Sequence, residues 1–320
     1  MNLTETQLVL ETLTLPLAAR KGLRISIARA DRVHPLASGN KFYKLLPNIE
    51  YAKRHHYSQV LSFGGAFSNH IHALALYSQA VGLRSIAIIR GEKEYASNPT
   101  LSAATAAGMT LVFVDRATYK RRNEVGYLGQ LQQQYPEALI IPEGGSNPLA
   151  VQGCSELMRH INQSCLETQG TIPDTVAVAC GTGTTLAGLV NGAEADQFIH
   201  GYLVLKDASV LLKVETLLAQ QTSPRRYQIH AADLGGYAKF DSKLLNFVLD
   251  ILQQTDILLD PIYTAKMCYC LMQQIEAGQF KVGSHVVILH SGGLQAWYGM
   301  KKKVIILSGY KAWQQIEAYL

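Results

Sequence analysis

Residues 175–185 read Thr-Val-Ala-Val-Ala-Cys-Gly-Thr-Gly-Thr-Thr and decide the kind of fold to expect. The first six residues form an apolar run of the length of one buried strand. Two glycines and three hydroxyl residues follow and lead into a helical pattern. Backbone N–H groups at such a helix start attract anions. The stretch therefore predicts a strand, a tight loop and a helix that can bind a phosphate, with an ordinary turn as the alternative.

The same succession repeats along the chain on both sides of this stretch. Short β-branched runs alternate with longer segments of helical spacing, which is the pattern of βαβ units and a mostly parallel sheet. The expected strands include Val60–Phe63, Ser85–Arg90, Thr110–Asp115, Leu139–Pro142, Thr175–Cys180, Tyr227–Ala231 and His285–His290. The length of 320 residues is enough for one large or two α/β domains.

Composition excludes several classes of protein. Apolar residues make up 48% and charged residues 17%, which is typical of a globular chain. The net charge is +5, but the basic runs are short, so we expect no nucleic-acid partner. We find no secretory signal, no apolar run long enough to span a bilayer, and no CxxC pair among the five cysteines. These features predict a cytoplasmic protein without a membrane partner. His70 and His72 have no third ligand nearby, so we predict no metal.

Two further strand-end loops contain glycine pairs. After the strand Val60–Phe63, the glycines at 64–65 precede Ser68 and Asn69, which are favourable N-cap residues for a following helix. The run His-Ser-Gly-Gly at 290–293 also follows an apolar strand. In open α/β sheets, ligands bind at the carboxyl ends of strands, so these loops are candidate binding sites. Taken alone, each of them is more often an ordinary turn.

One lysine upstream is a candidate nucleophile. Lys41 ends the polar turn Ser-Gly-Asn-Lys at 38–41. A lysine in such a turn is most often simply solvated. It can form a Schiff base instead if burial or a neighbouring cation lowers its pKa, and Lys44 is such a neighbour.

Taken together, these motifs occur in a specific order. Gly-Asn-Lys (39–41) precedes Gly-Gly-Ala-Phe-Ser-Asn-His (64–70), Gly-Thr-Gly-Thr-Thr (181–185), Asp-Pro-Ile-Tyr-Thr (260–264) and His-Ser-Gly-Gly (290–293). From Arg29 to Tyr298, the chain resembles the 1-aminocyclopropane-1-carboxylate (ACC) deaminase and D-cysteine desulfhydrase family of pyridoxal 5'-phosphate (PLP) enzymes.

This resemblance implies the fold type II architecture of PLP enzymes. Two open, twisted, mostly parallel sheets would be flanked by helices, with PLP in the cleft between two domains. Residues 1–50 and 157–320 would form the larger, PLP-binding domain, and residues 51–156 the smaller α/β domain. The resemblance also implies a homodimer.

Cofactor-binding roles follow from the same resemblance. Lys41 looks like the lysine that carries PLP covalently, and Asn69 like the residue that hydrogen-bonds the phenolic oxygen of the cofactor. Thr264 lies at the position that contacts the pyridine nitrogen. The residues that resemble the phosphate cradle are Gly181, Thr182, Gly183, Thr184 and Thr185.

Substrate-binding and catalytic roles are implied in the same way. Ser68, Asn69 and His70 resemble the helix start that receives the substrate carboxylate. Ser68, Tyr237 and Tyr263, together with the PLP lysine, are the predicted catalytic residues.

Two residues bear on the substrate. ACC deaminases resemble one another in having Glu at the position of Thr264, whereas the threonine here is neutral. A neutral partner of the pyridine nitrogen favours early loss of a good β leaving group over opening of a cyclopropane. We therefore expect α,β-elimination on a small, D-configured amino acid such as D-cysteine, giving a 2-oxo acid, ammonia and sulfide. Phe67 departs from the family, which usually has Gln there beside the carboxylate site.

Three alternatives stay open. The first is ACC deamination to 2-oxobutyrate and ammonia. The second is a non-catalytic protein that binds PLP or an amino acid, which the Phe67 departure keeps in play. The third is a phosphate-binding α/β module without PLP, which rests only on residues 181–185.

Overall fold

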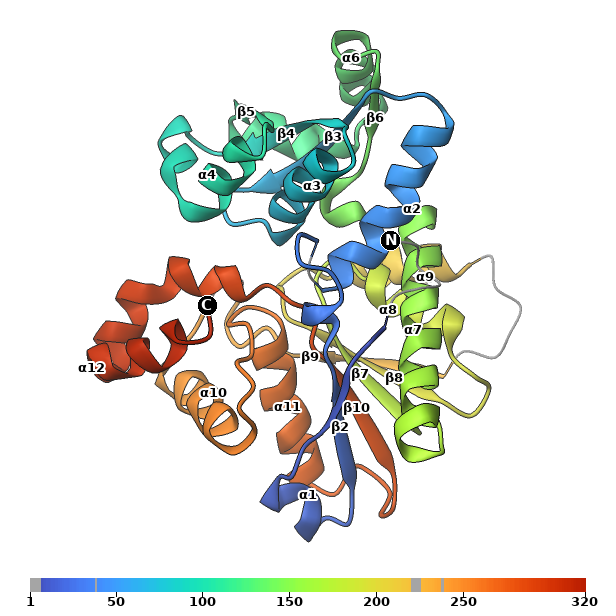
Figure 1. Ribbon diagram of the computed structural model, residues 1–320, viewed down its shortest axis with the longest axis vertical. Helices are drawn as coiled ribbons and strands as arrows, with labels where there is room; N and C mark the ends of the chain where they lie inside the picture. The colour runs from blue at the N-terminus through green and yellow to red at the C-terminus, as the bar shows by residue number, and fades with distance from the viewer. Residues whose placement is uncertain (1–6, 38, 220–225, 237–238) are drawn as a thin grey trace.

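The computed structural model describes residues 7–37, 39–219, 226–236 and 239–320. Within them, two sheets lie one above the other, each flanked by helices (Figure 1). The larger sheet has the strand order β1-β2-β10-β7-β8-β9 and is parallel except for β1, which pairs with β2 antiparallel. Its strands are β1 Leu10–Thr12, β2 Arg24–Ala28, β7 Thr175–Cys180, β8 Phe198–Leu203, β9 Tyr227–Ala231 and β10 His285–Leu289.

The smaller sheet has the order β5-β4-β3-β6 and is parallel throughout. Its strands are β3 Gln59–Gly65, β4 Arg84–Arg90, β5 Thr110–Val114 and β6 Ala138–Ile140. The expected fold class, with two mostly parallel sheets and flanking helices, is confirmed.

Helices cover both faces of the larger sheet, which is why β7 and β10 are buried along their whole length and read as continuous apolar runs. One face packs against α2 Asn40–Arg54, α7 Pro148–Gln169, α8 Thr184–Gly192 and α9 Ser209–Leu218. The other packs against α1 Pro16–Arg20, α10 Ser242–Thr255, α11 Thr264–Glu276 and α12 Lys301–Glu317.

The smaller sheet is covered by α3 Asn69–Ala80, α4 Pro99–Ala106, α5 Arg116–Lys120 and α6 Val125–Gln134. Short 3-10 turns connect several elements: η2 Ala30–Arg32, η3 Lys93–Ser97, η4 Arg121–Asn123, η5 Glu143–Gly145 and η6 Leu294–Met300. One face of the smaller sheet shares its hydrophobic core with α2 and α7, so the two sheets are joined by buried apolar side chains.

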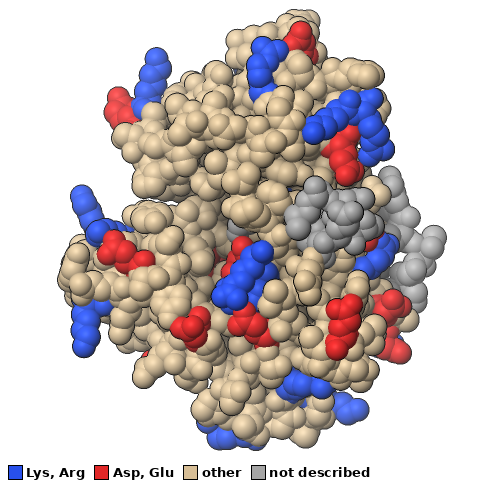
Figure 2. Space-filling view, viewed as in Figure 1, with Lys and Arg blue, Asp and Glu red and all other residues tan. Residues whose placement is uncertain are grey.

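In the part of the chain that the structure describes, no helix combines the length and apolar character needed to cross a bilayer. On the face shown in Figure 2, lysine and arginine side chains are interspersed with acidic ones, and no large area carries a single sign of charge.

Candidate active site

A cavity of about 490 Å³ is lined by residues that follow strands of both sheets. The loop after β3 of the smaller sheet and the loops after β7 and β10 of the larger sheet all reach it. Within each sheet, the carboxyl ends of the parallel strands meet at one edge. Of the residues predicted from the sequence, these line the cavity: Lys41, Ser68, Asn69, His70, Gly181, Thr182, Gly183, Thr185 and Tyr263. Tyr237 lies outside the described residues.

Lys41 is the second residue of α2, and Gly39 determines where that helix begins. The φ of Gly39 is 74°, and a Cβ there would lie 1.9 Å from the carbonyl oxygen of Ser291. Only glycine tolerates this approach, so the loop after β10 packs directly against the turn that carries the lysine. The Lys41 Nζ donates to Oδ1 of Asn40 at 3.1 Å, and Nδ2 of Asn40 donates to Oγ1 of Thr185 at 2.9 Å. Asn40 thus connects the lysine to the glycine-rich loop.

The electrostatic surroundings favour a neutral Lys41. Burial, and then the positive charge of Lys44, lower the pKa of the Lys41 amine to about 7. Lys44 lies one helical turn further along, is 3% exposed, and makes a long contact of 3.4 Å from Nζ to the Gly144 oxygen. An amine with a pKa near neutrality is a competent Schiff-base nucleophile and proton acceptor.

Ser68 and Asn69 begin α3 at the edge of the cavity. Ser68 is the N-cap, and its Oγ accepts the N–H of Ile71 at 3.3 Å. As an acceptor in that bond, the hydroxyl keeps its own hydrogen for another partner. The helix start therefore offers N–H groups and a hydroxyl donor to an anion in the cavity.

His70 is buried, and its hydrogen bonds define its tautomer. The Ser62 hydroxyl donates to the Ile141 oxygen at 2.8 Å and also contacts Nε2 of His70 at 2.8 Å. Since a hydroxyl has one hydrogen, Nε2 must be the donor to Ser62, which leaves Nδ1 as an acceptor. Burial, and then the charges of Lys41 and Lys44, hold the pKa of His70 well below its usual value. The ring is therefore neutral, and its buried Nδ1 has no hydrogen-bond partner among the described residues.

The glycine-rich loop is tightly packed. Gly183 has a φ of 82°, and a Cβ there would lie 2.5 Å from a Val214 methyl group in α9. The Thr184 hydroxyl contacts those of Ser146 at 2.7 Å and Thr182 at 3.1 Å. Thr184 is the one member of the predicted cradle that is absent from the cavity wall, and it supports the loop from behind.

Asp260 organises the start of α11. Its buried carboxylate accepts the N–H groups of Ile262, Tyr263 and Thr264 at 2.7–3.0 Å. Tyr263 lies on the cavity wall beside Gly181, where a Cβ would be 3.2 Å from the ring. Thr264 is completely buried behind that wall, and its Oγ1 has no hydrogen-bond partner within the described residues.

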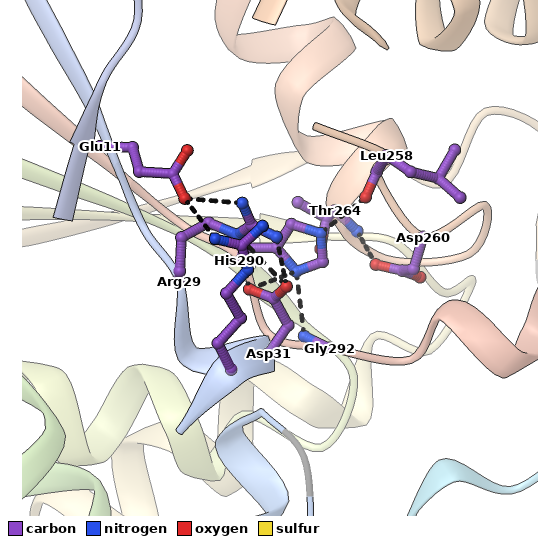
Figure 3. Close-up of polar contacts among 9 residues, drawn as sticks. Glu11, Arg29, Asp31, Leu258, Asp260, Thr264, His290 and Gly292 are labelled. Atoms are coloured by element: carbon purple, nitrogen blue, oxygen red, sulfur yellow. Dashed lines mark hydrogen bonds and ion pairs between the residues drawn. The ribbon is translucent and has the colours of Figure 1, made fainter. Parts of the chain in front are cut away.

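A buried ion-pair network lies beneath the loop after β10 (Figure 3). Arg29 is 5% exposed and pairs with Glu11 at 2.8 Å and with Asp31 at 2.7 Å. Asp31 in turn lies 3.5 Å from Nδ1 of His290, the residue that follows β10. The network ties β1, β2 and β10 together under Gly39 and the lysine turn.

The rim of the cavity carries more cations than acids. The cations are Arg90, Arg122, Lys206 and Lys213, and the acids are Glu143 and Asp207. Arg122 pairs with Glu143 at 2.6 Å. Such an excess of positive charge attracts anionic ligands to a cleft.

The cavity fits PLP by its own chemistry. It combines an amine of lowered pKa with a glycine-rich helix start suited to a phosphate. Two buried polar atoms have no partners among the described residues, namely Nδ1 of His70, which lines the cavity, and Oγ1 of Thr264, which lies behind its wall. Among those residues, no three His, Cys, Asp or Glu side chains are grouped so as to hold a metal ion. These features define an α/β protein built to bind a phosphorylated aldehyde.

Comparisons with known proteins agree. A family model described as pyridoxal-phosphate dependent enzyme matches residues 8–292, so the chain belongs to that family and depends on PLP. It is 28% identical over 307 residues to the bifunctional D-cysteine desulfhydrase/ACC deaminase of Arabidopsis thaliana, covering 90% of this chain and 77% of the relative. It is 28% identical over 296 residues to the D-cysteine desulfhydrase of Klebsiella pneumoniae, covering 87% of this chain and 89% of the relative.

Solved structures show the same fold. A crystal structure described as an ACC deaminase homologue superposes with a TM-score of 0.81 at 22% identity, over 96% of this chain and 95% of the other. An O-ureido-L-serine synthase superposes with a TM-score of 0.64 at 14% identity, over 91% and 90%. The family, the fold and the cofactor expected from the sequence are thereby confirmed.

Sequence reasoning gave no role to several side chains of the site. Asn40 and Asp260 lie inside the motifs that carried the resemblance, so the sequence located them near the site. It did not predict the hydrogen bonds that they make there. Gln295 lines the cavity beyond the last motif, and no pattern in the sequence pointed to it.

Proposed function

We propose that this chain catalyses α,β-elimination on a small β-substituted amino acid, with D-cysteine as the lead substrate. The observation that carries the proposal is the amine of Lys41, which lies in the cavity with a pKa of about 7, together with the helix start at Ser68. Lys41 can hold the cofactor and later take a proton, and the helix start at Ser68 can hold a carboxylate.

We infer that Lys41 holds PLP and that residues 181–185 receive its phosphate. Bound there, PLP supplies an electron sink for the bonds at Cα of an amino acid. Asn69 would donate to the phenolic oxygen, and Thr264 would offer its hydroxyl to the pyridine nitrogen.

The remaining work belongs to side chains of this protein. The N–H groups at the start of α3 and the Ser68 hydroxyl would orient the substrate carboxylate. The Lys41 Nζ, neutral for much of the time near pH 7, would take the proton from Cα. Tyr263, on the cavity wall, would supply a proton to the departing β substituent. The sequence predicts that Tyr237 assists it.

The choice of elimination over ring opening rests on Thr264. Its hydroxyl is neutral, and the neighbouring carboxylate of Asp260, which precedes α11, is occupied by three backbone N–H groups. A neutral partner at the pyridine nitrogen gives a weaker electron sink, which suits loss of a good leaving group such as sulfide.

ACC deamination is the second candidate, because the Arabidopsis relative is named for both activities. Incubating the PLP-supplemented protein with D-cysteine, L-cysteine and ACC separates the two. Sulfide and pyruvate from D-cysteine support the elimination. 2-Oxobutyrate from ACC without sulfide from cysteine would replace it with the second candidate. Cofactor binding without turnover of any amino acid in a broad panel would favour a non-catalytic role.

We also propose that the protein is a cytoplasmic homodimer whose smaller domain comprises residues 51–156. The compartment is supported by the cysteine usage, because no two of the five cysteines pair in a disulfide among the described residues; they are Cys154, Cys165, Cys180, Cys268 and Cys270. Light scattering of the purified protein tests the dimer, and a mass of one chain, 35.1 kDa, would refute it.

A further inference from the structure

The side chain of Asn69 lies where the two halves of the molecule meet. Asn69 begins α3, beside the smaller sheet, whereas Gln295 belongs to η6, after the last strand of the larger sheet. Nε2 of Gln295 donates to Oδ1 of Asn69 at 2.8 Å, across 226 positions of the chain. Both residues line the cavity, so this bond fixes a group that a ligand would meet.

Gly293 supports the other end of the same amide. Its φ is 98°, and a Cβ there would lie 2.4 Å from Nδ2 of Asn69. No side chain can occupy that position, so the amide packs directly against the backbone of Gly293. Nδ2 has no hydrogen-bond acceptor within the part of the chain that the structure describes. Its two hydrogens are the part of Asn69 left for a ligand.

The turn that precedes Gln295 and contains Gly293 is itself anchored by hydrogen bonds. The His290 ring donates from Nε2 to the Leu258 oxygen at 2.9 Å and accepts the Gly292 N–H at Nδ1, at 3.2 Å (Figure 3). Since Nδ1 accepts that N–H, the ring carries its hydrogen on Nε2. The turn between β10 and η6 therefore has little freedom to move, and Gln295 is presented from a rigid support.

We propose that Gln295 is a positioning residue that sets the orientation of the Asn69 amide. The two ends of an asparagine amide differ, one accepting and one donating, and Nε2 of Gln295 can only donate. It therefore selects Oδ1 and leaves Nδ2 for the cavity. The inference rests on the proposed function, in which Nδ2 donates to the phenolic oxygen of PLP. Without Gln295, the amide can rotate and turn Oδ1 toward that negative oxygen.

The expected effect is spectroscopic. A donor on the phenolic oxygen stabilises its negative charge and lowers the pH at which the covalently bound cofactor changes its near-visible absorbance. Hydrogen bonds to charged groups are strong enough that losing this one should raise the midpoint by about 1 pH unit. A residue that only supported the fold would change stability and leave that midpoint in place.

The test is a pH titration of the absorbance of the PLP-loaded wild type, four single variants and one double variant. Gln295→Met keeps the size of the side chain and removes the donor, and Gln295→Glu replaces the donor with an acceptor. Asn69→Ala removes the proposed ligand group. Gln315→Met, exposed on α12, is the matched control. If Gln295→Met folds poorly, Gln295→Glu carries the comparison.

Raised midpoints in the Gln295 and Asn69 variants, an unchanged control, and no further rise in the double variant Asn69→Ala/Gln295→Met support the inference. A raised midpoint in Asn69→Ala alone overturns the role of Gln295 and leaves Asn69 on the cofactor. An unchanged midpoint in Asn69→Ala overturns both. A wild-type protein that binds no PLP would overturn the proposed function itself.

Discussion

Lys41 should react as a neutral amine at pH values where an ordinary lysine is charged. Burial is the larger cause of its lowered pKa and the charge of Lys44 the second. The fall from 10.5 to about 7 corresponds to roughly 5 kcal/mol of preference for the neutral form. At pH 8, roughly nine tenths of the amine would be neutral, against roughly 0.3% for an unperturbed lysine.

The assay is competitive acetylation of the cofactor-free protein between about pH 5 and pH 11. The labelled Lys41 peptide is quantified by mass spectrometry against that of Lys243, an exposed lysine in α10. The midpoint should lie near 7 and should rise by about 1 unit in Lys44→Met, which removes the like charge and leaves the burial. A midpoint near 10.5, or one that does not respond to Lys44→Met, would refute the reasoning.

The same pKa predicts a stability effect with a definite sign. Between about pH 7 and pH 10.5 the unfolded chain binds a proton at Lys41 that the folded chain does not, so the residue lowers stability as the pH falls through this window. Lys41→Met should therefore unfold at higher denaturant concentration than the cofactor-free wild type at pH 7. The gain, up to about 5 kcal/mol, should shrink toward pH 10.5. Equal midpoints at both pH values would count against a buried, uncharged lysine.

Three further variants probe the surroundings of the site. Gly39→Ala should lose roughly 1–3 kcal/mol more stability than Gly108→Ala. Both glycines have positive φ, but only Gly39 faces a backbone oxygen. Equal losses in denaturant titrations would contradict this prediction. Asp31→Asn should cost about 3 kcal/mol at neutral pH, because it breaks a buried pair with Arg29. Burial raises the pKa of Asp31, but its pairing with Arg29 lowers it, and the net pKa lies below its usual value. The wild type should therefore lose stability below about pH 4, and the variant should lack that loss. Phe67→Gln removes the apolar ring that packs on Gly299. Loss of this apolar surface should disfavour the S-methyl group, so the ratio of kcat/KM for D-cysteine to that for S-methyl-D-cysteine should rise about tenfold. An unchanged ratio would exclude Phe67 from substrate selection.

The sequence predicted the parts of this molecule that depend on local patterns. Apolar strands followed by glycines identified the loops at 64–70, 181–185 and 290–293, and the parallel topology brings all three to one cavity. Strand β2 was missed, although it lies inside the larger sheet, between β1 and β10. Its Arg-Ile-Ser-Ile-Ala pattern alternates as a half-exposed strand would. Ser26 is nevertheless buried, because its hydroxyl bonds to His285 at 3.0 Å.

Contacts between distant residues were beyond sequence reasoning. The bond from Gln295 to Asn69 and the ion pairs of Arg29 depend on how the chain folds back, and a lone polar residue carries no sign of its partner. Thr264 illustrates a related limit: the motif located it correctly at the start of α11, but only the structure places it behind the cavity wall. The roles assigned to individual site residues remain predictions.

The most direct test of the central claim is to find which residue carries the cofactor. The PLP-loaded protein is reduced with borohydride, which makes the bond between cofactor and lysine permanent, and the modified peptide is identified by mass spectrometry. The modification should lie on Lys41 and be absent from Lys41→Ala, which should also lose the near-visible absorbance band. Modification of Lys44 instead, or of no lysine in the cavity, would contradict the account.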